Sequence, residues 1–325
     1  MVGDIFFESL LKKLKEADKR DYQSICDSFL DSQVDSVMQA RISCIDTVEK
    51  NFRDGLQKFL AHQDSIWYDV FSLSQSMYQI AVDSSKEFSD YYRTSLEPSK
   101  RASLQHTFIA LEQIHGRACQ EFLEILYLMR LGFADGAFAR WRSLFELQCT
   151  ALFISQQGET IAKQFIDASF GDGQHYEWAN GAVNKDGSII KSGSFKKIFN
   201  GCNFPNESRN IWYRQYQYAC LTTHASPQGT MGRIALRQGV PCVPIGQTDY
   251  GIDIPAKHAA RSLALESCAF FSIYPYGNNA TYSVVLNNWA DLIDEAADFA
   301  VEEAFKNHNK ADLFDSSHNK IHKKV

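Results

Sequence analysis

The segment FADGAFARWRSLFELQ, Phe133 to Gln148, places charged side chains among phenylalanines, leucines and a tryptophan at helical spacing. On a helical wheel one face of this segment is apolar at both ends and charged in the middle. That face carries Asp135, Phe138, Arg142, Glu146, Cys149 and Phe153. A charge on a core-facing surface must be paired and hydrogen-bonded. We therefore expect a packed helix from its N-cap, Asp135, to about residue 157, with a polar contact on the buried face.

Helical spacing continues on both sides of this segment. Before it, apolar residues recur every three or four positions from Leu104 to Met129. No proline occurs between residues 99 and 204, and long proline-free stretches with this spacing favour helices. Further helices are expected over 159–169, 207–224, 255–272 and 283–306. The chain is therefore expected to be all-α, a multi-helix bundle with an N-terminal helical extension and one long irregular excursion.

The pattern also divides the chain into regions. Residues 1–95 contain three amphipathic helices, whose apolar faces should pack against each other or against a partner. Pro98, in the linker TSLEPSK, separates them from a helical domain over 101–306 that carries the polar motif. Within that domain, residues 171–205 are rich in Gly, Asn, Ser and Lys and form the expected excursion. The tail, 307–325, lacks periodicity and is expected to be disordered.

Composition and charge narrow the class of protein. A net charge of −6 provides no strong attraction for nucleic acid or for an anionic membrane. No run approaches the roughly 18 apolar residues of a membrane span. None of the eight cysteines forms a C-x-x-C pair, so we expect reduced thiols in a cytoplasmic protein. The chain has no dinucleotide-binding, P-loop, GxSxG or HExxH motif, and we expect neither a cofactor nor a metal.

Two partial metal motifs are incomplete. EQIH, Glu112 to His115, has the Glu-x-x-His spacing of di-iron bundles, but such a site needs two copies. HYE, His175 to Glu177, followed by Pro241 and Cys242, is similar to the zinc-deaminase pattern. Ile245 stands where that pattern needs its second cysteine, so neither motif predicts a metal site.

The polar residues of two predicted helices define a candidate site. The candidate catalytic residues are Arg142, Glu146 and His224, and the candidate ligand-binding residues are Arg140, Tyr216 and Ser226. His224 follows the aromatic stripe of WYRQYQYACLTTHASP, and a helix C-terminus favours a charged histidine. If His224 faces Arg142 and Glu146, the three suit acid–base chemistry on a phosphate ester. The alternative is structural: an Arg–Glu bridge between helices and an aromatic core stripe with a capping histidine.

The run from LMRLGFADGAFARWRSLFELQ onward, with the later YACLTTHASPQG, resembles a bacterial all-helical domain family of unknown function. The resemblance covers about residues 104–300 and centres on a G-x-A-x-G-A-x-x-R-W-R-[ST]-L-x-E helix. The resemblance implies an all-helical cytosolic protein, and some such domains occur among mobile and phage-defence genes. By position, Arg140, Arg142, Glu146 and His224 match the polar motif residues of the family. Phe145 replaces the His or Tyr of that pattern.

Two functions remain open at this point. The first is an interaction or sensor protein of a bacterial stress or phage-defence system. Its N-terminal helices would contact a protein partner or a second copy of the chain. The alternative is a toxin-like, metal-independent effector ribonuclease of the HEPN type, in which Arg142 would hold the phosphate of an RNA partner while His224 and Glu146 move protons. A membrane partner is not expected.

Overall fold

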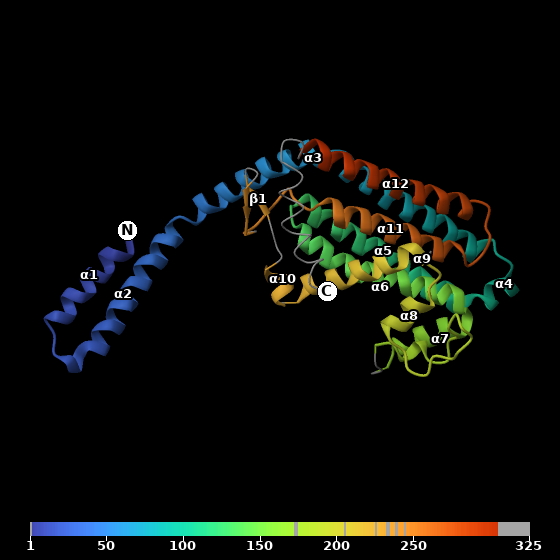
Figure 1. Ribbon diagram of the computed structural model, residues 1–325, viewed down its shortest axis with the longest axis horizontal. Coiled ribbons are helices and arrows are strands. Elements are labelled where there is room, and N and C mark those ends of the chain that lie inside the picture. Colours follow the sequence, from blue (N-terminus) through green and yellow to red (C-terminus); the bar gives the residue numbers. More distant parts are fainter. Residues whose placement is uncertain are drawn as a thin grey trace. The chain divides into compact units, whose positions relative to one another are not determined.

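The computed structural model describes residues 2–171, 175–204, 206–224, 226–231, 235–237, 240–243 and 245–304. The chain is all-α, as predicted, with one short antiparallel strand pair (Figure 1). The elements are α1 Val2–Lys15, η1 Lys19–Asp21, α2 Tyr22–Ser43, α3 Ile45–Thr94, α4 Pro98–Ser103, α5 Gln105–Arg130, α6 Ala134–Gln157, α7 Glu159–Ala168, η2 Glu177–Ala179, α8 Phe195–Gly201, α9 Asn206–Thr223, α10 Pro227–Met231, β1 Ala235–Arg237, β2 Val240–Cys242, α11 Asp253–Phe271 and α12 Asn279–Ala304.

The chain divides into two compact units, Met1–Phe59 and Leu60–Val325. The linker around Pro98, where we expected the boundary, lies inside the second unit as the turn between α3 and α4. Pro98 occupies the first turn of α4, where its missing N–H costs nothing. The division into 1–95 and 101–306 stays a prediction about folding units, and the tail 307–325 lies outside the described residues.

In the first unit, α1 and α2 pack against each other. Phe29 of α2 is buried, and the Lys13 ammonium of α1 lies 5.6 Å from the centre of its ring. Eight other large apolar side chains of α2 and early α3 are 51–72% exposed. We call them the N-terminal apolar stripe: Leu30, Val34, Val37, Met38, Ile42, Ile45, Val48 and Phe52.

In the second unit, α11 packs against α5, α6 and α12 (Figure 1). Its buried face is rich in alanine, so the neighbouring backbones approach closely: Ala256, Ala259, Ala260 and Ala264 are 0–1% exposed. Trp141 of α6 is fully buried and donates from Nε1 to Ser262 Oγ of α11 at 2.9 Å. This bond satisfies a polar atom that would otherwise be costly in the core.

The core of the second unit contains an ionisable pair. His115 of α5 and Glu266 of α11 join through Nδ1 and Oε2 at 2.7 Å, with side chains 3% and 0% exposed. The other ring nitrogen of His115 lies 3.3 Å from the carbonyl oxygen of Ala81. Glu112, the other half of the EQIH motif, is half-buried and pairs with Arg93 instead. The Glu and the His of the EQIH motif therefore contact different partners, Arg93 and Glu266.

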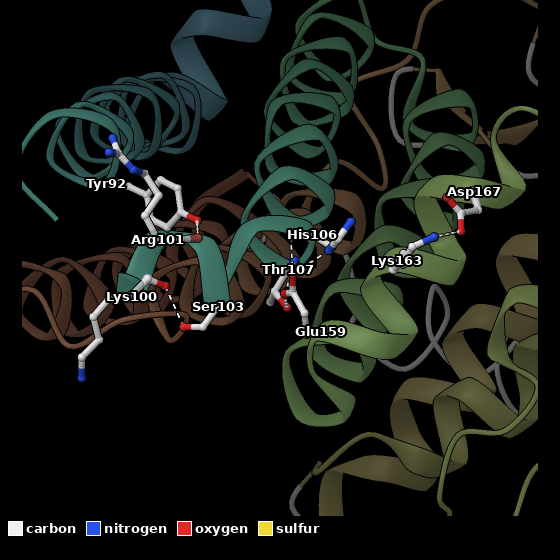
Figure 2. Close-up of polar contacts among 9 residues, drawn as sticks. All are labelled: Tyr92, Lys100, Arg101, Ser103, His106, Thr107, Glu159, Lys163 and Asp167. Carbon is white, nitrogen blue, oxygen red and sulfur yellow. Dashed lines mark hydrogen bonds and ion pairs between the residues drawn. The ribbon is translucent and has the colours of Figure 1, made fainter. Parts of the chain in front are cut away.

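The first turn of α5 is capped from a distant helix. Leu104, the residue before α5, has no capping side chain. Glu159, at the start of α7, instead accepts hydrogen bonds from the backbone N–H groups of His106 and Thr107 at 2.7 and 3.0 Å (Figure 2). The Thr107 hydroxyl donates to it at 2.8 Å, and His106 Nδ1 lies at 2.7 Å. A carboxylate at a helix N-terminus satisfies free N–H groups and complements the helix dipole.

The expected N-cap of α6 differs from the structure. The helix begins at Ala134 with Phe133 as its cap residue, and Asp135 lies inside the first turn. Gly132, with φ of 76°, allows the sharp turn that joins α5 to α6. Asp135 still contributes a favourable negative charge to the first turn.

The excursion at 171–205 contains η2, α8 and an isolated bridge between Val183 and Ile189. Its aromatic residues anchor it to the bundle. Trp178 is 7% exposed and meets Phe153 and Phe165 edge to face. Phe195 and Phe199 of α8 pack against Phe145 of α6. Phe145 is therefore a core anchor for the excursion.

Candidate functional site

A polar cluster lies where α6 meets α9. Tyr216 of α9 donates from its hydroxyl to Glu146 Oε1 at 2.6 Å, and Arg142 Nε lies 3.8 Å from the same oxygen. Arg142 and Glu146 are both 28% exposed, so neither is a free surface charge. Arg142 and Glu146 are one helical turn apart on α6, so they lie together on the polar face that the sequence predicts. Helix α9 adds the phenol of Tyr216 to this pair.

Aromatic packing positions this cluster. Phe145 stacks on Trp212 of α9, with ring centres 5.6 Å apart and planes at 7°. Phe195 of α8 lies 4.6 Å from the Tyr216 ring. These contacts fix the rotation of α9, so that Tyr216 points toward Glu146. The tyrosines and tryptophan of WYRQYQY are therefore both a core stripe and a support for the site.

The two phenols of the site remain protonated at neutral pH. Burial, together with the hydrogen bond to Glu146, raises the pKa of Tyr216 far above its ordinary value. Burial and the negative charge of Glu146 raise the pKa of Tyr176, which precedes η2, to about 12. Burial opposes the charge on Arg142, but Glu146 and the nearby Cys220 and Tyr216 raise its pKa overall. The arrangement presents one guanidinium, one carboxylate and neutral phenol donors, which suits recognition of a polar group.

Arg142 has unused hydrogen-bonding capacity. Its Nε is buried and has no hydrogen-bond partner among the described residues, because the 3.8 Å approach to Glu146 is too long for a hydrogen bond. A buried donor without a partner is costly. A ligand anion or a carbonyl oxygen would satisfy it.

The remaining candidate residues lie elsewhere. His224 is exposed and follows the end of α9, eight residues beyond Tyr216, which is about 12 Å along a helix axis. Ser226 accepts at its hydroxyl from the Gly229 N–H at 3.0 Å and so begins α10. No described interaction joins either residue to Arg142 or Glu146. The predicted grouping of His224 with the two α6 residues stays a prediction.

Arg140 belongs to a different network. It points from α6 to α5, where its Nε lies 2.6 Å from Glu124 and its Nη2 lies 3.5 Å from Glu121. Burial raises the pKa of Glu121, while Arg140 and Arg117 act against this rise. The network ties the two helices together and lies on another face of α6 from Glu146.

Sequence reasoning overlooked two residues near the site. Tyr176 lies in the irregular excursion, where no periodicity shows which way a side chain points. His258 of α11 packs against Trp141 and Trp212, and burial lowers its pKa to about 4. With that pKa it is a neutral imidazole at pH 7, and its Nδ1 donates to the Ile254 carbonyl oxygen at 2.8 Å. A single histidine in an alanine-rich helix gave no signal of this contact.

Neither metal binding nor a membrane span has support in the described residues. Nowhere in that part of the chain do three His, Cys, Asp or Glu side chains gather as metal ligands would. None of the described helices is both long and apolar enough to cross a membrane.

Comparison with protein-family models places part of the chain in a known group. Residues 108–201, most of α5 through α8, match the model of a family of unknown function, DUF5677. The matched segment contains Arg142 and Glu146 and ends before α9. No curated protein and no solved structure matches the chain significantly. The match supports the coarser expectation, a resemblance to a family of unknown function over these residues, and assigns no activity.

Proposed function

We propose that this protein is a helical interaction protein that binds a second copy of itself through the N-terminal apolar stripe. One observation carries the proposal: eight large apolar side chains within Leu30–Phe52 are each more than half exposed. Such contiguous apolar surface is characteristic of interaction sites. Scattered single residues would need no partner, but these recur at helical spacing along α2 and early α3.

The charges beside the stripe favour a second copy in antiparallel orientation. Residues 27–40 carry three acidic side chains and no basic one, a net charge of −3. Residues 41–58 carry four basic and three acidic side chains, a net charge of +1. In an antiparallel pair the acidic half of one copy meets the more basic half of the other, whereas a parallel pair places like charges together.

The experiment measures the mass of the full chain in solution by analytical ultracentrifugation. Phe52→Glu places a charge in the stripe, and Gln57→Glu places the same charge on an exposed position of the same helix outside it. We expect wild type and Gln57→Glu to be dimers and Phe52→Glu to be monomeric at the same concentration. Circular dichroism of each variant tests that folding is intact. A monomeric wild type, or a Phe52→Glu dimer as stable as wild type, would contradict the proposal.

The second unit fits a sensor role in the same proposal. The Arg142–Glu146–Tyr216 cluster offers donors and charge for a ligand, while its phenols are far from titrating near neutral pH. The proposed setting, a bacterial stress or phage-defence system, rests on the resemblance described above. Cytoplasmic location is part of the same proposal.

A second candidate function is the effector ribonuclease, and the unpartnered Nε of Arg142 is the observation that favours it. In that mechanism Arg142 binds the phosphate and His224 and Glu146 transfer protons. The test is cell growth and total RNA after induction of wild type and of His224→Ala, whose exposed side chain leaves the core intact. Growth arrest with RNA cleavage, lost in the folded variant, supports the nuclease. Normal growth with intact RNA under wild type excludes it.

A further inference from the structure

A polar hollow of about 410 Å³ lies between the 184–186 turn, α8 and the first turns of α9. It is separate from the Arg142–Glu146–Tyr216 cluster and shares no residue with it. All six side chains that line it are polar, and three are cations: Asn184, Lys185, Asp186, Lys197, Asn200 and Arg209. Polar and charged linings of this kind select a charged ligand rather than an apolar one.

Two of the three cations of this hollow, Lys197 and Arg209, donate their hydrogen bonds to uncharged carbonyl oxygens. Lys197 Nζ donates to the Ser192 carbonyl oxygen at 2.6 Å. Arg209 Nη2 donates to the carbonyl oxygens of Phe199, at 3.1 Å, and of Asn200. These bonds orient the two cations but leave their charge uncompensated. Among the described residues, no carboxylate forms an ion pair with either of them.

The third cation is affected by the same positive field. Burial lowers the pKa of Lys185, and the positive charge of Arg209 lowers it further. A bound anion would offset this repulsion and would be attracted by the same positive charges.

The one carboxylate in the lining is engaged elsewhere. Asp186 accepts from the Ser188 hydroxyl at 2.6 Å and from the Ser188 N–H at 2.9 Å. Three cations and one carboxylate leave the hollow with a net charge of +2. The side-chain amides of Asn184 and Asn200 also line this space, and Asn184 Nδ2 donates to Ser188 Oγ at 3.0 Å.

We propose that this hollow binds the phosphate group of a small phosphorylated molecule. A phosphate monoester carries about 1.5 to 2 negative charges near pH 7, which is close in magnitude to the positive charge of the lining. A guanidinium and two ammonium groups are the side chains that bind phosphate oxygens most strongly. The volume fits a small organic phosphate, because ligand pockets of about 300–1,000 Å³ hold such molecules.

A nucleic-acid strand contains the same phosphate chemistry, but the structure favours the small molecule. The three cations converge on one hollow instead of following an extended track. The chain as a whole carries a net charge of −6, which opposes the approach of a long polyanion.

The test is isothermal titration calorimetry of the full chain with inorganic pyrophosphate, at low salt. Lys197→Gln removes one lining cation and should weaken binding roughly tenfold. Lys196→Gln is the matched control, because Lys196 is the adjacent exposed residue of α8 and does not line the hollow. Asp186→Asn removes the opposing carboxylate and should tighten binding several-fold. Arg209 is left unchanged, because it also caps the backbone of α8.

Each outcome decides the proposal. Pyrophosphate binding that weakens in Lys197→Gln, is unchanged in Lys196→Gln and tightens in Asp186→Asn supports it. Absence of binding, or equal loss in both lysine variants, overturns it. A single-stranded RNA of 20 nucleotides is titrated in parallel. If RNA binds, loses affinity in Lys197→Gln but not in Lys196→Gln, and pyrophosphate alone does not bind, the site belongs to a nucleic-acid backbone and the proposal fails.

Discussion

Separating His115 from Glu266 should strongly destabilise the second unit. Both side chains are at most 3% exposed, so solvent screening does not reduce the effect. Glu266 Oε1 has no hydrogen-bond partner in the described part of the chain, so His115 is the main compensation for this carboxylate. Removing one partner of a buried ion pair costs about 3–5 kcal/mol. For a unit of this size that is roughly 6–20 °C in melting temperature.

The pair also predicts a pH dependence. Burial by itself lowers the pKa of His115, but the neighbouring Cys119 and Glu266 raise it well above its ordinary value. We attribute the rise to Glu266, because a buried thiol stays neutral at pH 7. A raised pKa in the folded state means that the stabilisation is complete below the unfolded value of about 6.5. The stabilisation is then lost as the pH rises through the higher folded value.

The assay is urea unfolding, followed by circular dichroism, of wild type, His115→Phe, Glu266→Leu and the double variant. The phenyl ring should retain the stacking of His115 on Phe270, whose planes lie at 17°. We expect each single change to be costly and the double change to cost less than the sum, because an apolar pair leaves no buried charge. Comparison of wild type with His115→Phe at pH 6 and pH 9 tests the titration. The reasoning is refuted if the costs of the two single changes add up to the cost of the double change. It is also refuted if the difference in unfolding free energy between wild type and His115→Phe is the same at pH 6 and pH 9.

Three further changes have defined outcomes. Burial raises the pKa of Glu159, but the hydrogen bonds from His106 and Thr107 lower it overall. Glu159→Gln should therefore cost about 1–2 kcal/mol at pH 7, discounted for partial exposure. The cost should begin to shrink as the pH falls below the unfolded value of about 4.3 and should be lost as it passes through the lower folded value. A constant cost down to pH 3 would contradict this. Among glycines, Gly116→Ala meets no atom within 4 Å and should stabilise α5 by roughly 0.5–1 kcal/mol. Gly201→Ala places a Cβ 2.7 Å from a buried ring and should cost about 1–3 kcal/mol. Thermal melts that rank the two alanine variants in the opposite order would refute the packing argument.

Sequence periodicity was sufficient for most of the fold, because apolar spacing and proline placement act locally. It predicted the helix over 159–169 and the last helix within a few residues of α7 and α12. It failed at the start of α6, because Gly132 makes the turn and Phe133 takes the cap position. The amphipathic pattern of the first 60 residues predicted helices, but did not predict that one of their apolar faces would be left uncovered.

The candidate site was predictable only in part. Arg142 and Glu146 are one turn apart, so a helical wheel places them together. Tyr216 joins them through tertiary packing that no local pattern contains. The same limit applies to His115 and Glu266, which are 151 positions apart in the chain. Irregular segments such as the excursion have no hydrophobic periodicity. Nothing in the sequence therefore indicated that Tyr176 would lie near the site.

The remote cap on α5 has a consequence for synthesis of the chain. The N–H groups of His106 and Thr107 find their acceptor in Glu159, 53 and 52 positions later. During translation the first turn of α5 must therefore stay frayed until α7 has left the ribosome. At typical elongation rates of about 5–20 residues per second, the delay is roughly 3–10 seconds. For that interval α5 and α6 are present without the contact that defines where α5 begins, and a chaperone would meet this open helix end.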